Sequence, residues 1–265
     1  MTTLSTFHNS VNLLACIDEY DDGIDDSIKS LCNHNSISGL AIININGRLI
    51  SSLNEDNLFK IRSLINKKPV NVIKLDIGYE SAPDEALIER SLSIASFFKS
   101  QIICVGADKK AFRDDTIFKL YLDRLTDRSV AMSIVPLLDI GSESYFKNAD
   151  HLLGLMSPYK RIKLLYDPCK FMEKSRTFPY EKWWSNVKKH VGAIVARDYK
   201  TGFGFFPVGL GQTKVFESIC EFISDGGKNI IFKPTLGRRY GSIIGRKSTF
   251  DLALKMLLER MDGKI

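Results

Sequence analysis

The feature that most constrains this fold is a regular alternation between short apolar runs and longer segments of helical periodicity. The apolar runs are rich in β-branched residues, have the length of single strands, and lie at residues 12–17, 38–45, 70–77, 101–107, 132–140, 161–167, 192–198 and 229–234. Amphipathic segments lie between or after them, at 84–100, 115–127, 144–156, 181–191, 213–227 and 249–261. Strands that alternate with helices in this way predict a parallel β-sheet, because each helix returns the chain to the same sheet edge.

The number of repeated units favours a closed barrel. Eight βα units in a chain of 265 residues match a (β/α)8 TIM barrel. The alternative is an open, doubly wound sheet, which commonly has fewer strands and a glycine-rich first turn that binds a pyrophosphate. The first turn here, DEYDDGIDD at 18–26, is acidic and would repel a pyrophosphate. We therefore predict an α/β fold with one TIM-barrel domain over residues 1–265.

Charged residues gather where the predicted strands end. In a parallel barrel the carboxyl ends of the strands surround the mouth in which active sites are built. The charged residues at these positions are Asp18, Glu19, Lys74, Asp76, Asp108, Asp139, Asp167, Arg197, Asp198 and Lys233. Lys233 is the least expected of them, because it follows the apolar run NIIF directly. The sequence predicts a charged cleft at this end of the barrel.

The distribution of charge favours a small anionic ligand. The chain has a net charge of +6, and residues 160–265 carry 21 Lys and Arg against 10 Asp and Glu. The glycine-rich loops 202–214 and 237–247 follow the last two predicted strands, and the second carries Arg238 and Arg239. Such loops hold phosphate groups in many barrels. We predict that substrate is bound by Lys74, Asp76, Asp198, Arg238 and Arg239. A solvated, lysine-rich surface is the alternative.

The cysteines and the first residues indicate a cytoplasmic protein. The five cysteines are odd in number, scattered, and without a C-x-x-C pair, so they predict neither a disulfide framework nor a structural zinc site. The N-terminal residues lack a basic leader with a long apolar core, and no apolar run reaches the length of a membrane span. We expect no contact with a membrane.

Three segments of the second half resemble a known family. LLYDPCKF, HVGAIVARDYKTGFGFFPVGLGQTKVFESICEFISDGG and NIIFKPTLGRRYG are similar, in order and spacing, to the sugar phosphate isomerase/epimerase family of xylose isomerase-like barrels. The resemblance covers roughly residues 130–260, and the first half shares only the rhythm of strands and helices. It implies a TIM barrel and an isomerase of carbohydrate metabolism.

The same resemblance implies an altered metal site. Members of the family hold a divalent metal with a glutamate, the aspartate of a D-P-x-N turn, a histidine and a final glutamate. These positions fall on Asp139, Asp167, Val195 and Lys233. Valine offers no lone pair and lysine adds a positive charge. We therefore predict no metal or other cofactor, and we expect the Lys233 ammonium group between Asp139 and Asp167. A divalent ion on these two carboxylates is the alternative.

Two functions of different class are consistent with this site. The first is an isomerase-, epimerase- or lyase-like enzyme for a small anionic sugar or polyol derivative, which needs no metal. Lys233 or Arg197 would polarise a carbonyl, and Asp139 or Asp167 would move a proton. In a variant Lys233 forms a Schiff base, which requires a lowered pKa. In either case Lys233→Ala would abolish turnover and leave the fold intact. The second is a non-catalytic ligand- or partner-binding protein on the same barrel.

Nucleic acid is not an expected partner. One branch of the family repairs abasic DNA with several histidines and carboxylates around several metals. The four histidines of this chain, at positions 8, 34, 151 and 190, do not fall at predicted strand ends. The oligomeric state stays open. Trp183 and Trp184 cannot face the same side of a helix, so we expect one against the barrel and the other near a rim or subunit contact.

Overall fold

Eight parallel strands close into a barrel in the computed structural model, which describes residues 11–20, 23–45, 50–65, 67–75, 77–175, 178–236 and 245–264. Neighbouring strands follow the chain order around the barrel, and the last strand pairs with the first. The strands are β1 (Asn12–Cys16), β2 (Gly39–Ile42), β3 (Val70–Lys74), β4 (Ile102–Gly106), β5 (Val135–Ile140), β6 (Lys163–Tyr166), β7 (Val191–Ala196) and β10 (Asn229–Phe232). The predicted α/β class and (β/α)8 TIM-barrel fold are confirmed.

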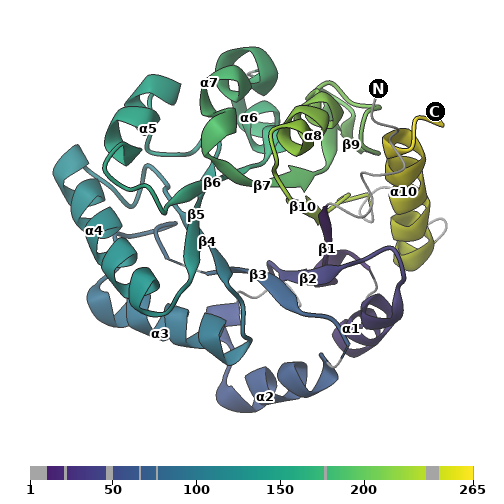
Figure 1. Cartoon of the computed structure of the whole chain (residues 1–265), viewed down its shortest axis with the longest axis horizontal. Helices are drawn as coiled ribbons and strands as arrows, with labels where there is room; N and C mark the ends of the chain where they lie inside the picture. Colours follow the sequence, from purple (N-terminus) through teal and green to yellow (C-terminus); the bar gives the residue numbers. More distant parts are fainter. Residues whose placement is uncertain are drawn as a thin grey trace.

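Helices surround the barrel on the outside (Figure 1). They are α1 (Ile24–Asn33), α2 (Glu55–Leu64), α3 (Glu85–Phe97), α4 (Asp115–Ala131), α5 (Ala149–Met156), α6 (Pro168–Ser175), α7 (Ser185–Val187), α8 (Val215–Ser224) and α10 (Arg246–Met261). A short antiparallel hairpin, β8 (Asp198–Lys200) and β9 (Gly204–Phe206), follows β7. The hairpin lies beside the mouth because β7 delivers the chain there.

Asparagine and aspartate caps fix where several helices begin. The side chain of Asp114 accepts hydrogen bonds from the backbone N–H groups of Thr116 and Ile117 at the start of α4. Asn54, Asp84 and Asn148 cap α2, α3 and α5 in the same way. Each cap satisfies backbone donors that have no partner inside the helix.

The barrel interior is filled by small and branched apolar side chains, which point inward from alternate strand positions. This inner cluster consists of Leu14, Cys16, Ala41, Ile43, Val72, Cys104, Leu137, Leu165, Ala193, Val195 and Ile231. A second, larger cluster fills the space between the strands and the helices. Val195 therefore serves as packing in the barrel interior, as its side-chain chemistry requires.

The inward-facing alternation continues into the mouth. Two residues beyond an inner-cluster position stand Lys74, Asp139, Asp167, Arg197 and Lys233, after Val72, Leu137, Leu165, Val195 and Ile231 respectively. Charged groups thus follow directly above an apolar floor. Asp198 follows Arg197 directly, and successive side chains of a strand point to opposite faces, so the Asp198 side chain points away from the barrel interior.

The predicted helix at 181–191 takes a different form. A π-helical turn at Tyr180–Trp184 is followed by α7 and then by a 3-10 turn at Lys188–His190. Trp183 and Trp184 are both buried, against our expectation that one would lie near the rim. Trp183 packs on Phe171 and Trp184 on Tyr166, with ring centroids 5.1 and 5.0 Å apart. Trp183 thus contacts α6, and Trp184 contacts β6.

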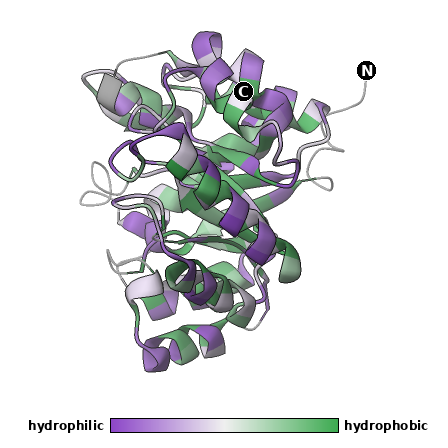
Figure 2. Ribbon diagram, turned by 90° about the vertical axis from the view of Figure 1, so that its left-hand side faces the viewer, coloured by the Kyte–Doolittle hydropathy of each residue, from purple (hydrophilic) through white to green (hydrophobic). Residues whose placement is uncertain are grey.

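Hydropathy follows this architecture. The central strands are mostly hydrophobic, and hydrophobic and hydrophilic residues alternate along the surrounding helices (Figure 2). Across the described ranges, no helix combines the length and the apolar character needed to cross a bilayer.

Candidate functional site at the mouth of the barrel

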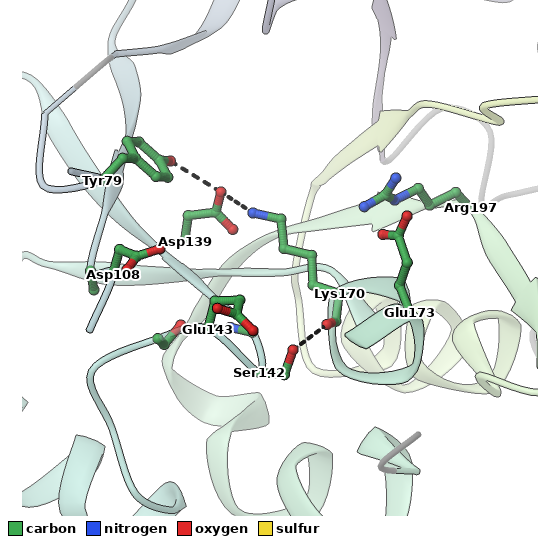
Figure 3. Close-up of a pocket in the computed structure, with 11 residues that line it drawn as sticks. Tyr79, Asp108, Asp139, Ser142, Glu143, Lys170, Glu173 and Arg197 are labelled. Carbon is green, nitrogen blue, oxygen red and sulfur yellow. Dashed lines mark hydrogen bonds and ion pairs between the residues drawn. The ribbon is translucent and has the colours of Figure 1, made fainter. Parts of the chain in front are cut away.

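A pocket of about 240 Å³ opens at the carboxyl ends of β3 to β7 (Figure 3). Its polar wall is formed by Tyr79, Asp108, Asp139, Glu143, Lys170, Glu173 and Arg197. Of the four predicted catalytic residues, Asp139 and Arg197 border it directly. Asp167 lies behind Arg197, and Lys233 lies outside the lining.

Asp139 is the centre of the charged contacts in this pocket. Its Oδ2 accepts a hydrogen bond from the Tyr79 hydroxyl at 3.1 Å, forms a short ion pair with Lys170 Nζ, and lies 3.6 Å from Lys74 Nζ. Its Oδ1 is buried and has no hydrogen-bond partner among the described residues. Burial alone would raise the pKa of Asp139, but Lys170 and Lys74 outweigh burial and lower that pKa. Asp139 is thus held as an anion with one oxygen unused.

Tyr79 reaches Asp139 because the chain turns sharply before it. Gly78 has φ +73°, and a Cβ atom there would lie 2.4 Å from the carbonyl oxygen of Gly106. A Cβ atom at Gly106 would in turn lie 2.6 Å from the Tyr79 ring. Two glycines are therefore required where the loop after β3 crosses the end of β4.

Lys170 was not among the predicted site residues. It lies in the first turn of α6, which begins at Pro168 directly after Asp167. Its backbone oxygen accepts a hydrogen bond from the Ser142 hydroxyl at 2.8 Å, which ties this turn to the loop after β5. The sequence did contain a signal. In the DPCK turn, Lys170 occupies the position of the asparagine in the family's D-P-x-N pattern.

Asp167 and Arg197 form a buried ion pair between the ends of β6 and β7. Arg197 Nε lies 3.0 Å from both oxygens of Asp167, and its Nη2 lies 2.6 Å from Oδ2. The guanidinium group also packs over the Phe205 ring of β9, 5.1 Å from the ring centroid. The pair holds Arg197 rigidly in the pocket wall.

Lys233 has partners different from those we expected. Its Nζ lies 3.5 Å from Asp18 and 3.7 Å from Glu19, on the segment after β1, and not between Asp139 and Asp167. The reason is topological, because β10 is the neighbour of β1 in the closed barrel. Burial would lower the pKa of Lys233, but the nearby Cys16, Asp18 and Glu19 outweigh burial and raise it. The Schiff-base variant requires a lowered pKa at Lys233, and this direction is the opposite.

Asp198, predicted to bind substrate, organises a loop instead. It is buried, and its carboxylate accepts hydrogen bonds from the backbone N–H groups of Tyr199, Gly209, Gly211 and Thr213 at 2.9–3.1 Å. The Thr213 hydroxyl adds a fifth at 2.7 Å. Its oxygens are thus occupied within the chain. Sequence position alone placed Asp198 in the mouth, whereas strand alternation turns it toward this loop.

The other predicted substrate-binding residues divide into two groups. Lys74 lies in the mouth, beside Asp139 and 4.6 Å from the centroid of the Tyr79 ring. Burial, aided by Lys170 and Lys233, lowers the pKa of Lys74, although Asp139 opposes the shift. Asp76, Arg238 and Arg239 lie outside the described residues.

The pocket is electrostatically uneven. Among its described lining residues, Asp108, Glu143 and Glu173 add carboxylates near the opening, whereas Lys170, with Lys74 behind it, stands beside Asp139. The deeper side thus has two ammonium groups around one carboxylate. A ligand with an oxo or anionic group at one end and hydroxyl groups at the other would complement this wall.

The donor set in the mouth does not fit a divalent metal. Across the described part of the chain, no group of three or more His, Cys, Asp or Glu residues is arranged to hold a metal ion. Asp139 is flanked by two lysines and Asp167 is bound by Arg197, so both carboxylates face cations of the chain itself. Placing a dication there would add repulsion without adding ligands.

Comparison with known proteins identifies the fold. No protein-family model and no curated protein matches the sequence. A xylose isomerase-like TIM barrel protein from Mycobacterium smegmatis in complex with magnesium matches with a TM-score of 0.66 at 12% identity, over 100% of this chain and 99% of that chain.

Two similar structures carry names of enzymes. A 3-keto-D-glucoside 4-epimerase from E. coli matches with a TM-score of 0.65 at 13% identity, over 93% of this chain and 98% of that one. A probable 3-DHS dehydratase from Bacillus anthracis matches with a TM-score of 0.65 at 15% identity, over 91% and 98%. At identities this low, the structural matches establish a shared fold and no shared activity. The chain is a (β/α)8 barrel of the xylose isomerase-like fold.

Proposed function

We propose that the protein is an isomerase-, epimerase- or lyase-like enzyme for a small oxo-bearing sugar or polyol derivative, and that it works without a divalent metal. The observation that carries the proposal is the convergence of Lys170, Lys74 and Tyr79 on one oxygen of buried Asp139, at the edge of a pocket. Buried charges of this kind at a cleft are typical of catalytic sites. The epimerase and the dehydratase of similar fold support the reaction class.

Each group has a role that its position allows. The Lys170 ammonium group and the Tyr79 hydroxyl can donate to a substrate oxygen that gains negative charge, as a metal would do by Lewis acidity. Asp139 borders the pocket as an anion, so its carboxylate can accept a proton from the carbon next to the carbonyl. Arg197, fixed by Asp167, can bind an anionic group. We assign Lys233 to the ion cluster that joins the first and last strands.

The site supports a compact, anionic ligand with hydroxyl groups. The pocket volume, about 240 Å³, lies just below the roughly 300–1,000 Å³ typical of drug-sized ligands. An oxo or carboxylate group would lie at Lys170, and hydroxyl groups would bind Glu143 and Glu173. Sugar acids and keto sugars have this pattern, in keeping with a cytoplasmic enzyme of carbohydrate metabolism. The carboxylates among the described lining residues would repel a nucleic-acid backbone, so we propose no nucleic-acid partner.

A direct test is hydrogen–deuterium exchange at carbon. The protein in D2O is incubated with aldoses, ketoses, keto-glycosides and oxo sugar acids, and loss of C–H signals is followed by NMR with and without a chelator. We expect exchange for one class, unchanged by chelation, and lost in Lys170→Met and Asp139→Asn. Lys255→Met is the matched control, because Lys255 lies on the exposed surface of α10. Exchange that stops on chelation and returns with magnesium would overturn the metal-free mechanism.

The second candidate is a non-catalytic binding protein. It is favoured by the self-contained ion pairs Asp167–Arg197 and Lys233–Asp18, which resemble structural pairs. Calorimetry with the same compounds distinguishes the two functions. Binding that Lys170→Met weakens, with no exchange for any compound, would establish this alternative.

A further inference from the structure

Two lysine ammonium groups share a single carboxylate oxygen at the pocket wall: Lys170 lines the pocket, and Lys74 lies behind it with a side chain that is still 20% exposed. Lys170 Nζ and Lys74 Nζ both approach Asp139 Oδ2, and the Tyr79 hydroxyl donates to the same atom. One carboxylate can compensate only one ammonium charge, so this cluster holds an excess positive charge below the surface. Such an excess is relieved when one lysine gives up its proton.

Geometry indicates which lysine does so. Lys170 makes the closer contact with Asp139, and its side chain is 30% exposed. Lys74 lies at 3.6 Å, an ion-pair distance that exceeds a good hydrogen bond, and its side chain is only 20% exposed. Its neighbour Tyr79 offers a ring face 4.6 Å away and not a second anion. Lys74 is therefore the more desolvated and the less compensated of the two.

The other groups around Lys74 also favour its neutral amine over its ammonium form. The groups that face it are Asp139 on β5, Cys104 on β4, Lys170 on α6 and Lys233 after β10. Burial and the two lysines lower its pKa against the opposing effect of Asp139. A desolvated lysine beside other cations is the environment in which amines act as nucleophiles.

The proton acceptor also requires a strongly activated substrate. Lys170 and Lys74 lower the pKa of Asp139 although burial opposes them, so its carboxylate is a weak base. A weak base removes a proton from carbon only when that carbon is made unusually acidic. An iminium ion at the neighbouring carbon has this effect, because its nitrogen accepts the electron pair.

We propose that Lys74 is a catalytic nucleophile that forms a Schiff base with the oxo group of the substrate, beside Lys170 and Asp139. This proposal rests on the proposed function and names its covalent step. It moves the imine-forming role from Lys233, the strand-end lysine beside Asp18 and Glu19, to the lysine at the end of β3.

The step balances without any further reagent. The lone pair of Lys74 Nζ forms a C–N bond to the carbonyl carbon, and the C=O π pair moves to oxygen, which takes a proton from the Lys170 ammonium group. The nitrogen returns a proton to Lys170, which gives a neutral carbinolamine. Lys170 then protonates the hydroxyl group, which leaves as water while the nitrogen lone pair forms the C=N bond. Lys170 regains its proton from solvent, and hydrolysis reverses the sequence.

Borohydride trapping tests this assignment. Wild-type protein is incubated with dihydroxyacetone or hydroxypyruvate, as neutral and anionic probes, then reduced with sodium borohydride and mapped by peptide mass spectrometry. We expect reduced adducts at Lys74 in at least tenfold excess over Lys170, Lys233 and surface Lys255. Lys74→Arg has no nucleophilic amine, so it should lose the adduct; because arginine stays protonated where the proposal has a neutral amine, Lys74→Met is measured beside it. An adduct spread evenly over surface lysines, or absent from Lys74 with both probes, would overturn the proposal.

Control variants distinguish a lost adduct from a folding defect. Lys74→Arg, Lys74→Met and Lys255→Arg are compared with wild type by circular dichroism and thermal unfolding. Lys255→Arg should keep the Lys74 adduct. Exchange at carbon without any Lys74 adduct would refute the Schiff base and leave the proposed function standing. Absence of both would count against the two proposals together.

Discussion

At the scale of single residues, Asp139 shows how one buried carboxylate can organise a site. Its Oδ2 collects contacts from three elements, namely the loop after β3, β3 itself and α6. The same contacts lower its pKa against the effect of burial. Removing its charge would leave the Lys170 ammonium group without its closest anion, and a buried pair that loses one partner is strongly destabilised.

We therefore expect Asp139→Asn to lower the free energy of unfolding by about 2 kcal/mol at pH 7, below the full value for a buried pair because both lysines keep some solvent contact. A lowered folded-state pKa stabilises the fold above the unfolded pKa of about 3.9, and this contribution is lost as pH falls through the folded-state value. The difference between wild type and variant should shrink from pH 5 to pH 3. Urea unfolding at several pH values measures it, and a difference that stays constant with pH would contradict this account.

At the scale of elements, the hairpin β8–β9 and its following loop depend on Asp198. Its carboxylate gathers backbone donors from residues 199 to 213. A Cβ atom at Gly211 would lie 2.2 Å from this carboxylate, so only glycine fits there. Strand β9 of the hairpin in turn carries Phe205, which packs on Arg197 in the pocket wall. Asp198 thus acts on the site by positioning a neighbouring element.

Asp198→Ala should release this loop. Four backbone N–H groups would lose a charged acceptor, and we expect their amide hydrogen exchange to accelerate by at least tenfold, with α4 unchanged. Hydrogen-exchange mass spectrometry of the peptides covering 199–213 measures this. Asp225→Ala, at the exposed end of α8, is the matched control and should change little. Equal exchange in wild type and variant would exclude the positioning role.

At the scale of the whole molecule, the barrel closes where the two ends of the chain meet. β1 and β10 pair in parallel from Asn12 with Asn229 to Ala15 with Phe232. Above this seam the Lys233 ammonium group lies between Asp18 and Glu19, and the Thr235 N–H group donates to Glu19 at 2.9 Å. These contacts join segments more than 200 residues apart in a chain of 265.

Lys233→Met should weaken this closure. It leaves two mostly buried carboxylates without their cation, and we expect a loss of about 2 kcal/mol in unfolding free energy at pH 7. Burial already raises the pKa of Glu19, so protonation on acidification should reduce the deficit of the variant. Chemical denaturation at pH 7 and pH 5 measures both effects, with Lys255→Met as a surface control. Unchanged stability together with lost carbon exchange would return Lys233 to the catalytic role that the sequence suggested.

The charge of the mouth as a whole predicts weak metal binding. Titration with Mn²⁺, followed by electron paramagnetic resonance of the free ion, should show well under one bound ion per chain at micromolar metal. The reason is that Asp139 and Asp167 already face Lys74, Lys170 and Arg197. Stoichiometric binding would mean that these cations move aside and that the metal-dependent alternative is correct.

The sequence by itself determined the barrel architecture and most of the charged residues that stand at the carboxyl ends of the strands. Periodicity is a local property, so the eight strands and the parallel barrel could be predicted from residue spacing. The inward alternation then carried Lys74, Asp139, Asp167, Arg197 and Lys233 to one end. Asp198 has the opposite parity, so its carboxylate accepts hydrogen bonds from the following loop, and Lys170 was missed because it stands on a helix turn and not at a strand end.

Only the tertiary structure decided which charges meet. Ion pairs form between groups that the closed barrel brings near each other, as β10 with β1 and β6 with β7. Adjacent strands lie about 4.8 Å apart, whereas strands across a barrel are separated by its packed interior. Lys233 therefore pairs with Asp18 and Glu19, and Asp139 pairs with Lys74 and Lys170. The positions of side chains around the mouth, which residue spacing does not encode, set the chemistry of the pocket.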